Sequence, residues 1–153
     1  EKATSNICTA QVLLSVMAGM YAVYHGPAGL KNIALRIHAH AQRLQHQLDK
    51  AGFNQVNVHY FDTLHVATQN SEFIKKEAEK QGYNFRYFAN GNIGISVDET
   101  TSYADVDRIA NIFASVNKET SAIKSDTQTS SSWPISLHRQ SAYLTHPVFN
   151  THH

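Results

Sequence analysis

Histidine is the residue type in this 153-residue chain with the most obvious capacity for chemistry, since imidazole binds metals and transfers protons near neutral pH. There are ten histidines. His38 and His40 are two residues apart in a segment of helical periodicity, so they point to different faces and cannot chelate one ion. His59 and His65 lie in short segments of strand character, where we expect partial exposure. With a single cysteine the chain offers no tetrahedral zinc set, and the sequence predicts no metal site.

The single cysteine, Cys8, stands at the head of an apolar run, where a helix N-terminus would favour the thiolate. A nucleophilic cysteine also needs a base and a group that orients the base. No such pattern surrounds Cys8, and we interpret it as a small buried hydrophobic residue. One cysteine also excludes an internal disulfide and favours a reducing compartment.

Two short motifs resemble ligand or acid–base sites. The segment 26–29, Gly-Pro-Ala-Gly, precedes a helix as phosphate-binding loops do, but Pro27 removes one backbone amide donor. Asp98 and Glu99 form a carboxylate pair before another helix, where the helix dipole stabilises acidic groups whether or not they react. We interpret the first motif as a helix boundary and the second as a helix approach.

The lysines matter because a Schiff-base lysine needs a desolvated pocket that lowers the pKa of its amine. Five of the lysines fall on predicted helix surfaces, where none has such a pocket: Lys31, Lys50, Lys75, Lys76 and Lys80. The residues by themselves therefore predict no catalytic, cofactor-binding or metal-binding group.

Two consecutive helices, at 7–25 and 27–51, would come first among the elements that position these residues. Ser5 or Asn6 can cap the first helix, and Gly26 ends it where Pro27 suits the next first turn. In the first helix a stripe of small or polar residues interrupts the apolar run, at positions 11, 15 and 19. We therefore expect a buried helix with one partner-facing stripe, and no membrane span.

After residue 52 the hydrophobic period changes. Segments 56–60 and 64–68 predict a hairpin, and a short helix begins at Asn70 or Ser71. That helix should turn Phe73, Ile74 and Ala78 inward. A second hairpin, with strands 84–88 and 92–97, is turned by Asn90-Gly91. The last helix begins at Thr101 or Ser102 and should bury Val106, Ile109, Ala110, Phe113 and Val116.

This order of elements predicts an α+β domain over residues 1–118, with helices packed on an antiparallel sheet. Residues 119–137 form a Ser/Thr-rich linker, and 138–153 begin a further, truncated segment. A net charge of +1 and the absence of any long basic run predict no nucleic-acid partner. Neither end resembles a natural terminus, so we expect a piece cut from a longer chain.

Five stretches carry a family resemblance, in the order "EKATSNICTAQ", "YAVYHGPAGLKNIA", "HYFDTL", "NIGISVDETT" and "LTHPVFNTHH". Together they resemble the P-protein family of the glycine cleavage system, the decarboxylating glycine dehydrogenases. The resemblance runs the length of the chain, and its first and last motifs are the most specific. It implies the small domain of a fold type I pyridoxal-phosphate enzyme, at the end of the first of two homologous halves.

The resemblance also implies a function for the longer protein. Such enzymes use pyridoxal phosphate to decarboxylate glycine and pass its aminomethyl group to the lipoyl arm of H-protein. The family's cofactor lysine lies in the second half, so we expect no cofactor on this chain and no activity from it alone. Its partners would be the remainder of the P-protein and H-protein, and uncovered apolar surface would allow a homodimer. The compartment would be the cytoplasm in bacteria or the mitochondrial matrix in eukaryotes.

Two groups of residues are candidates to approach the active site of the intact enzyme. They are Thr4, Ser5, Asn6 and Thr9 near the start, and Thr145, His146, Phe149 and Asn150 near the end. Helix capping and packing explain the same residues equally well. The alternative from another functional class is a free-standing module that binds a small ligand, because similar α+β patterns occur in regulatory domains.

Overall fold

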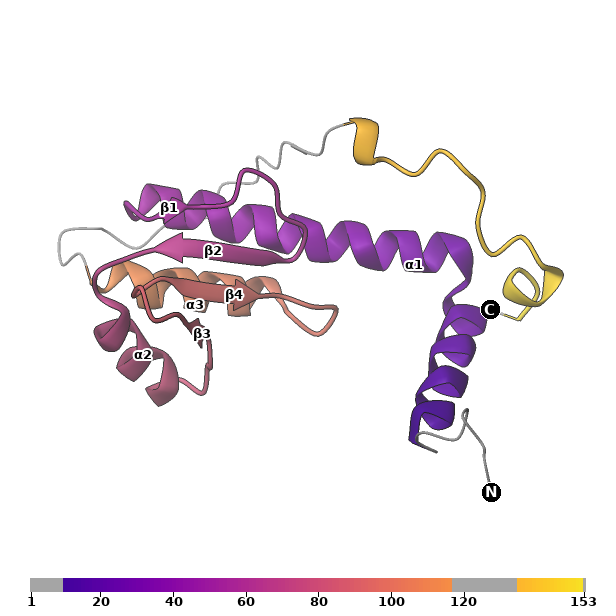
Figure 1. Cartoon of the computed structure of the whole chain (residues 1–153), viewed down its shortest axis with the longest axis horizontal. Helices are drawn as coiled ribbons and strands as arrows, with labels where there is room; N and C mark the ends of the chain where they lie inside the picture. Colours follow the sequence, from indigo (N-terminus) through magenta and orange to yellow (C-terminus); the bar gives the residue numbers. More distant parts are fainter. Residues whose placement is uncertain (1–9, 117–134, 153) are drawn as a thin grey trace, which may run out of the picture. The chain divides into compact units, whose positions relative to one another are not determined.

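The structure is a computed structural model that describes residues 10–116 and 135–152 (Figure 1). The chain divides into two compact units, one of Glu1–Ile33 with Arg139–His153 and one of Ala34–His138. Within the described residues, no helix is both long and apolar enough to pass through a membrane.

The first helix, α1 (Ala10–Lys50), is interrupted at Gly26, whose φ of 61° and ψ of 177° are not helical. Backbone in this region is accessible essentially only to glycine. Pro27 follows and starts the next helical stretch, which suits its fixed φ and missing N–H. The break thus falls where the sequence predicts one helix to end and another to begin.

The start of α1 contradicts the expectation of a buried helix. Every residue from 11 to 20 is exposed, and Leu13 and Leu14 each keep 64% of their accessible surface. The run is as apolar as expected, but the described residues of its own unit do not cover it. The helical periodicity of the apolar residues predicts that this helix is buried, but it does not identify the surface that buries it.

In the unit Ala34–His138 a four-stranded antiparallel sheet has the order β1-β2-β4-β3. Its strands are β1 (Asn54–Gln55), β2 (Thr63–Ala67), β3 (Arg86–Tyr87) and β4 (Ile93–Ser96). Alternate residues of β2, Leu64 and Val66, are buried in one core with residues of α1 and of the helices α2 (Ser71–Lys80) and α3 (Tyr103–Ala114). The predicted α+β class, with helices on an antiparallel sheet, is confirmed.

The first predicted hairpin is wrong in its first strand. β1 ends at Gln55, and residues 56–62 form a loop in which Val58 is 84% exposed. The end of this loop is held to α1 by a hydrogen bond between His38 Nδ1 and the Phe61 carbonyl oxygen, 2.8 Å apart. The ladder continues only to Val56, whose N–H donates to the His65 carbonyl oxygen at 2.7 Å.

The second hairpin is confirmed, with shorter strands than predicted. β3 and β4 pair antiparallel, and Gly91 adopts the positive φ of 85° that the turn requires. In α2 the core face is made by Ile74 and Ala78, one turn apart. Phe73 was expected on that face but is 47% exposed, because it lies about 100° around the helix from Ile74.

The start of α3 is confirmed at Ser102, which forms a reciprocal capping box with Asp105. The predicted inward residues of this helix are buried, and Val116 beyond its end is half-buried. Most of the predicted linker at 119–137 lies outside the described residues. The described residues after it form two short 3₁₀ turns, η1 (Ile135–Leu137) and η2 (Pro147–Phe149).

Candidate functional site

Of the two groups of candidate residues, the structure describes only the second. Thr4, Ser5, Asn6 and Thr9 lie outside the described residues. The second group lies in or beside η2, within the unit Glu1–Ile33 with Arg139–His153. Thr145, His146 and Asn150 are exposed, whereas Phe149 is half-buried.

Hydrogen bonds make residues 144–151 a small closed turn. The Asn150 side-chain amide donates to the carbonyl oxygens of Leu144 at 2.9 Å and His146 at 3.1 Å. His146 Nδ1 accepts the Val148 N–H at 3.2 Å, so in the neutral ring the proton is on Nε2. Leu144 has a φ of 49°, a strained value for a non-glycine residue. The structure thus brings His146 and Asn150 together, with most of their polar groups used to hold the turn.

The same turn is tied to the break in α1. The Tyr143 hydroxyl donates a hydrogen bond to the Pro27 carbonyl oxygen. The Arg139 guanidinium lies over the Tyr143 ring, 5.4 Å from its centre. A segment near residue 143 therefore packs on the helix break 116 residues earlier in the chain.

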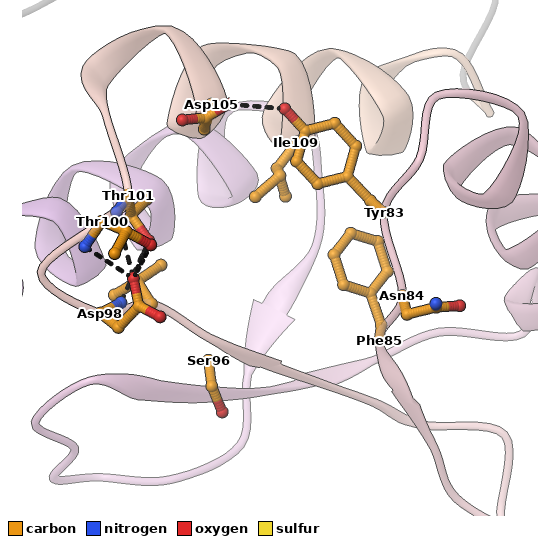
Figure 2. A pocket seen from close by; sticks show the side chains of 10 residues that line it. Tyr83, Asn84, Phe85, Ser96, Asp98, Thr100, Thr101, Asp105 and Ile109 are labelled. Atoms are coloured by element: carbon orange, nitrogen blue, oxygen red, sulfur yellow. Dashed lines mark hydrogen bonds between the residues drawn. The ribbon is translucent and has the colours of Figure 1, made fainter.

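A cavity of about 230 Å³ lies in the unit Ala34–His138, between the start of α3 and the sheet (Figure 2). Its walls carry Tyr83, Phe85, Ser96, Asp98, Asp105 and Ile109, with other residues of the same loops. Two carboxylates beside a cavity could bind a cation or move a proton, so their partners decide what this cavity can do.

Both carboxylates are occupied by local hydrogen bonds. Asp98 accepts from the backbone N–H and the hydroxyl of Thr100 and of Thr101, at 2.7 to 3.2 Å. Asp105 accepts from Ser102 and, at 2.8 Å, from the Tyr83 hydroxyl, as Figure 2 shows for the Tyr83 contact. The hydrogen bonds from Thr100 hold the pKa of Asp98 below its ordinary value, and those from Ser102 lower the pKa of Asp105 to about 2.

These carboxylates are therefore ionised at neutral pH and serve the turn and the helix start. That outcome agrees with the interpretation of Asp98 as part of a helix approach. It leaves the cavity without a group poised to exchange protons near neutral pH.

A further polar cluster joins α1 to α3. Arg43 donates to both carboxylate oxygens of Asp107, and the Gln47 amide donates to the same carboxylate at 2.7 Å. His40 is 2% exposed, and burial, aided by Arg36 and Arg43, lowers its pKa. The cluster links two helices and does not line the cavity, and among the described residues it leaves His40 Nδ1 and Gln47 Oε1 buried without a hydrogen-bond partner.

The comparisons with known proteins agree with one another. Residues 1–113 match the family described as "Glycine cleavage system P-protein". The chain belongs to the glycine cleavage system P-protein family. The predicted resemblance is thereby confirmed, and this family consists of fold type I pyridoxal-phosphate enzymes.

Individual P-protein relatives match the whole chain. It is 53% identical over 153 residues to the "Glycine dehydrogenase (decarboxylating)" of Stenotrophomonas maltophilia, covering 100% of this chain and 16% of that protein. The proteins of the same description from Flavobacterium johnsoniae and Cupriavidus metallidurans are 50% and 49% identical, again over 100% of this chain and 16% of theirs. The chain thus spans about one sixth of the length of these relatives.

The cavity beside α3 lacks the residue type that binds the cofactor of the P-protein family. Pyridoxal phosphate is held by a lysine, and no lysine lines the cavity. Within the described residues, Lys80 pairs with Glu77, and Lys75 lies over the Tyr87 ring at 5.5 Å. Nor do three or more His, Cys, Asp or Glu side chains of the described part gather where they could hold a metal ion.

Sequence reasoning missed the two tyrosines that connect distant segments. Tyr143 reaches Pro27 across 116 residues, and Tyr83 reaches Asp105 across 22. Neither contact has a local signal, because no periodicity or turn motif relates positions so far apart.

Proposed function

We propose that this chain is a structural portion of a P-protein that decarboxylates glycine and transfers its aminomethyl group to the lipoyl arm of H-protein. The observation that carries the proposal is the identity of about 50% over the whole chain to decarboxylating glycine dehydrogenases. The lysine that holds pyridoxal phosphate then belongs to the polypeptide beyond these 153 residues, which is consistent with the lysine-free cavity wall. The relatives compared are bacterial, which favours the cytoplasm.

The test compares the full-length polypeptide with the 153-residue chain. With pyridoxal phosphate, glycine and lipoylated H-protein, the full-length protein should release carbon dioxide from the glycine carboxyl group. The 153-residue chain should show neither this release nor a lysine-linked cofactor absorbance. Turnover by the short chain together with such an adduct would refute the proposed division of roles, and an inactive full-length protein would refute the activity.

The second candidate is a free-standing module that binds a small ligand, and the cavity beside α3 is the observation in its favour. Calorimetry of the chain with glycine and other amino acids tests it. Binding of micromolar strength that is lost in Ile109→Trp, a change that fills the cavity, would support this candidate. We expect no binding heat, because both carboxylates of the cavity already have hydrogen-bond donors.

A further inference from the structure

Residues 11–24 of α1, here called the apolar segment, form a helix of mostly apolar side chains that the described residues of its own unit leave exposed. The segment contains no charged residue. Its large side chains keep much of their accessible surface: Val12 66%, Leu13 64%, Leu14 64%, Val16 55%, Met17 58%, Met20 61% and Tyr24 70%. Contiguous apolar exposure of this kind marks a surface that another surface covers.

The distribution of these side chains around the helix indicates how it is covered. At about 3.6 residues per turn, the large apolar side chains occupy roughly 200° of the circumference. The remaining arc holds uncharged, mostly small residues: Gln11, Ser15, Ala18, Gly19 and Ala22. A helix on the surface of a globular protein has a charged or polar face opposite its apolar stripe, and a helix that is apolar on most sides lies inside a protein.

This distribution of side chains distinguishes between two surfaces that could cover the segment: a second copy of the chain, and a groove in the rest of the P-protein. A second copy of the chain, meeting this helix about a two-fold axis, would cover the same stripe on each copy and leave the other sides in water. Enclosure needs a groove, and the P-protein relatives offer polypeptide for one, since this chain accounts for only 16% of their length. We propose that the apolar segment is enclosed in a groove of the P-protein polypeptide outside these 153 residues.

The inference rests on the proposed function, because it takes the chain to work as part of a P-protein. It adds that the apolar segment is the surface of this chain that contacts the rest of the P-protein, and it specifies the chemistry of the groove there. The groove is apolar and free of unpaired charge, because a charge buried against this segment would find no partner on it.

The test measures thiol reactivity in the full-length protein. Leu14→Cys and Val16→Cys place thiols two residues apart, on opposite sides of the helix. Each variant is treated with a maleimide, natively and in guanidinium chloride, and the modified peptide is quantified by mass spectrometry. Enclosure slows native modification at both positions by roughly 100-fold or more relative to the unfolded protein of the same variant.

Other outcomes would overturn the inference. Fast modification at both positions means an uncovered helix, and protection of one position that fades on dilution means a second copy. If a variant fails to fold, hydrogen exchange of the unsubstituted full-length protein decides: the amides of residues 11–24 should exchange as slowly as those of β4. Carbon dioxide release, measured on the same samples, tests the proposed function separately, since protected thiols in an inactive protein would refute only the activity.

Discussion

At the scale of single residues, the carboxylates around α3 have pKa values that are lowered by hydrogen bonds within a turn and a helix start. Asp98 and Asp105 each collect donors from the residues two or three positions away, and Asp105 adds Tyr83. Such bonds favour the charged form, which makes both groups poor proton donors at neutral pH. They hold the chain in the turn that leads from β4 into the helix.

This role predicts a specific response to acid. The pKa of Asp105 lies at about 2 in the folded chain, below its ordinary value of 3.8, so ionisation stabilises the fold. That contribution is complete above the ordinary pKa and is lost as the pH falls from 3.8 through about 2. In Asp105→Asn, the thermal unfolding midpoint should therefore be lower at neutral pH and fall less steeply over this range.

The matched control is Glu99→Gln, which removes one exposed carboxylate from the same region without removing a helix cap. It should keep the acid response of the unsubstituted chain. If the thermal unfolding midpoint falls equally steeply with pH in the unsubstituted chain and in Asp105→Asn, Asp105 does not contribute to acid stability.

At the scale of elements, the break in α1 depends on one glycine and on a contact made from the far end of the chain. Gly26 adopts backbone angles that other residues rarely reach, and the next carbonyl, that of Pro27, accepts the Tyr143 hydroxyl. The break is therefore set both by local backbone chemistry and by a long-range hydrogen bond.

Two glycine substitutions in the same helix should have opposite effects. Gly26→Ala should lower the free energy of unfolding by about 1–3 kcal/mol, because alanine is strained at these angles. Gly19→Ala should raise it by roughly 0.5–1 kcal/mol, because alanine favours a helix interior. A new Cβ at Gly19 meets no atom within 4 Å. Urea titration followed by circular dichroism measures both, and a neutral Gly26→Ala would contradict the assigned backbone strain.

At the scale of the whole molecule, the largest contrast is between one unit with its own core and a helix that the described residues of its own unit leave exposed. In the unit Ala34–His138, Phe113 is fully buried and meets the rings of Phe53 and Phe85 at centroid distances of 5.2 and 5.9 Å. The apolar segment has no comparable surroundings among the described residues. The unit Ala34–His138 therefore has a core of its own, whereas the apolar segment needs a further surface to cover it.

Two phenylalanines test where the core lies. Phe113→Ala should lower the free energy of unfolding by about 3–5 kcal/mol, through lost burial and the cavity left behind. Phe73→Ala, at a position that is 47% exposed, should cost less than about 1 kcal/mol. Chemical denaturation of both variants measures the difference, and similar losses would restore the prediction that Phe73 faces the core.

The sequence by itself determined the fold class, the family, the break at Gly26 and the start of the last helix at Thr101 or Ser102. These depend on residue types at short spacing: glycine before proline, capping residues ahead of an apolar helix, and apolar residues at helical period. The absence of a predicted catalytic group also follows from residue types, since no cysteine, histidine or lysine stood in a reactive pattern.

Only the tertiary structure decided that residues 56–62 form a loop, that Phe73 is exposed, and that Tyr143 and Tyr83 reach partners far along the chain. It also showed that the apolar segment has no cover among the described residues. Each of these depends on which surfaces meet after folding. Local periodicity encodes the need for burial or for a hydrogen-bond partner, and only the arrangement of the elements in space decides what meets that need.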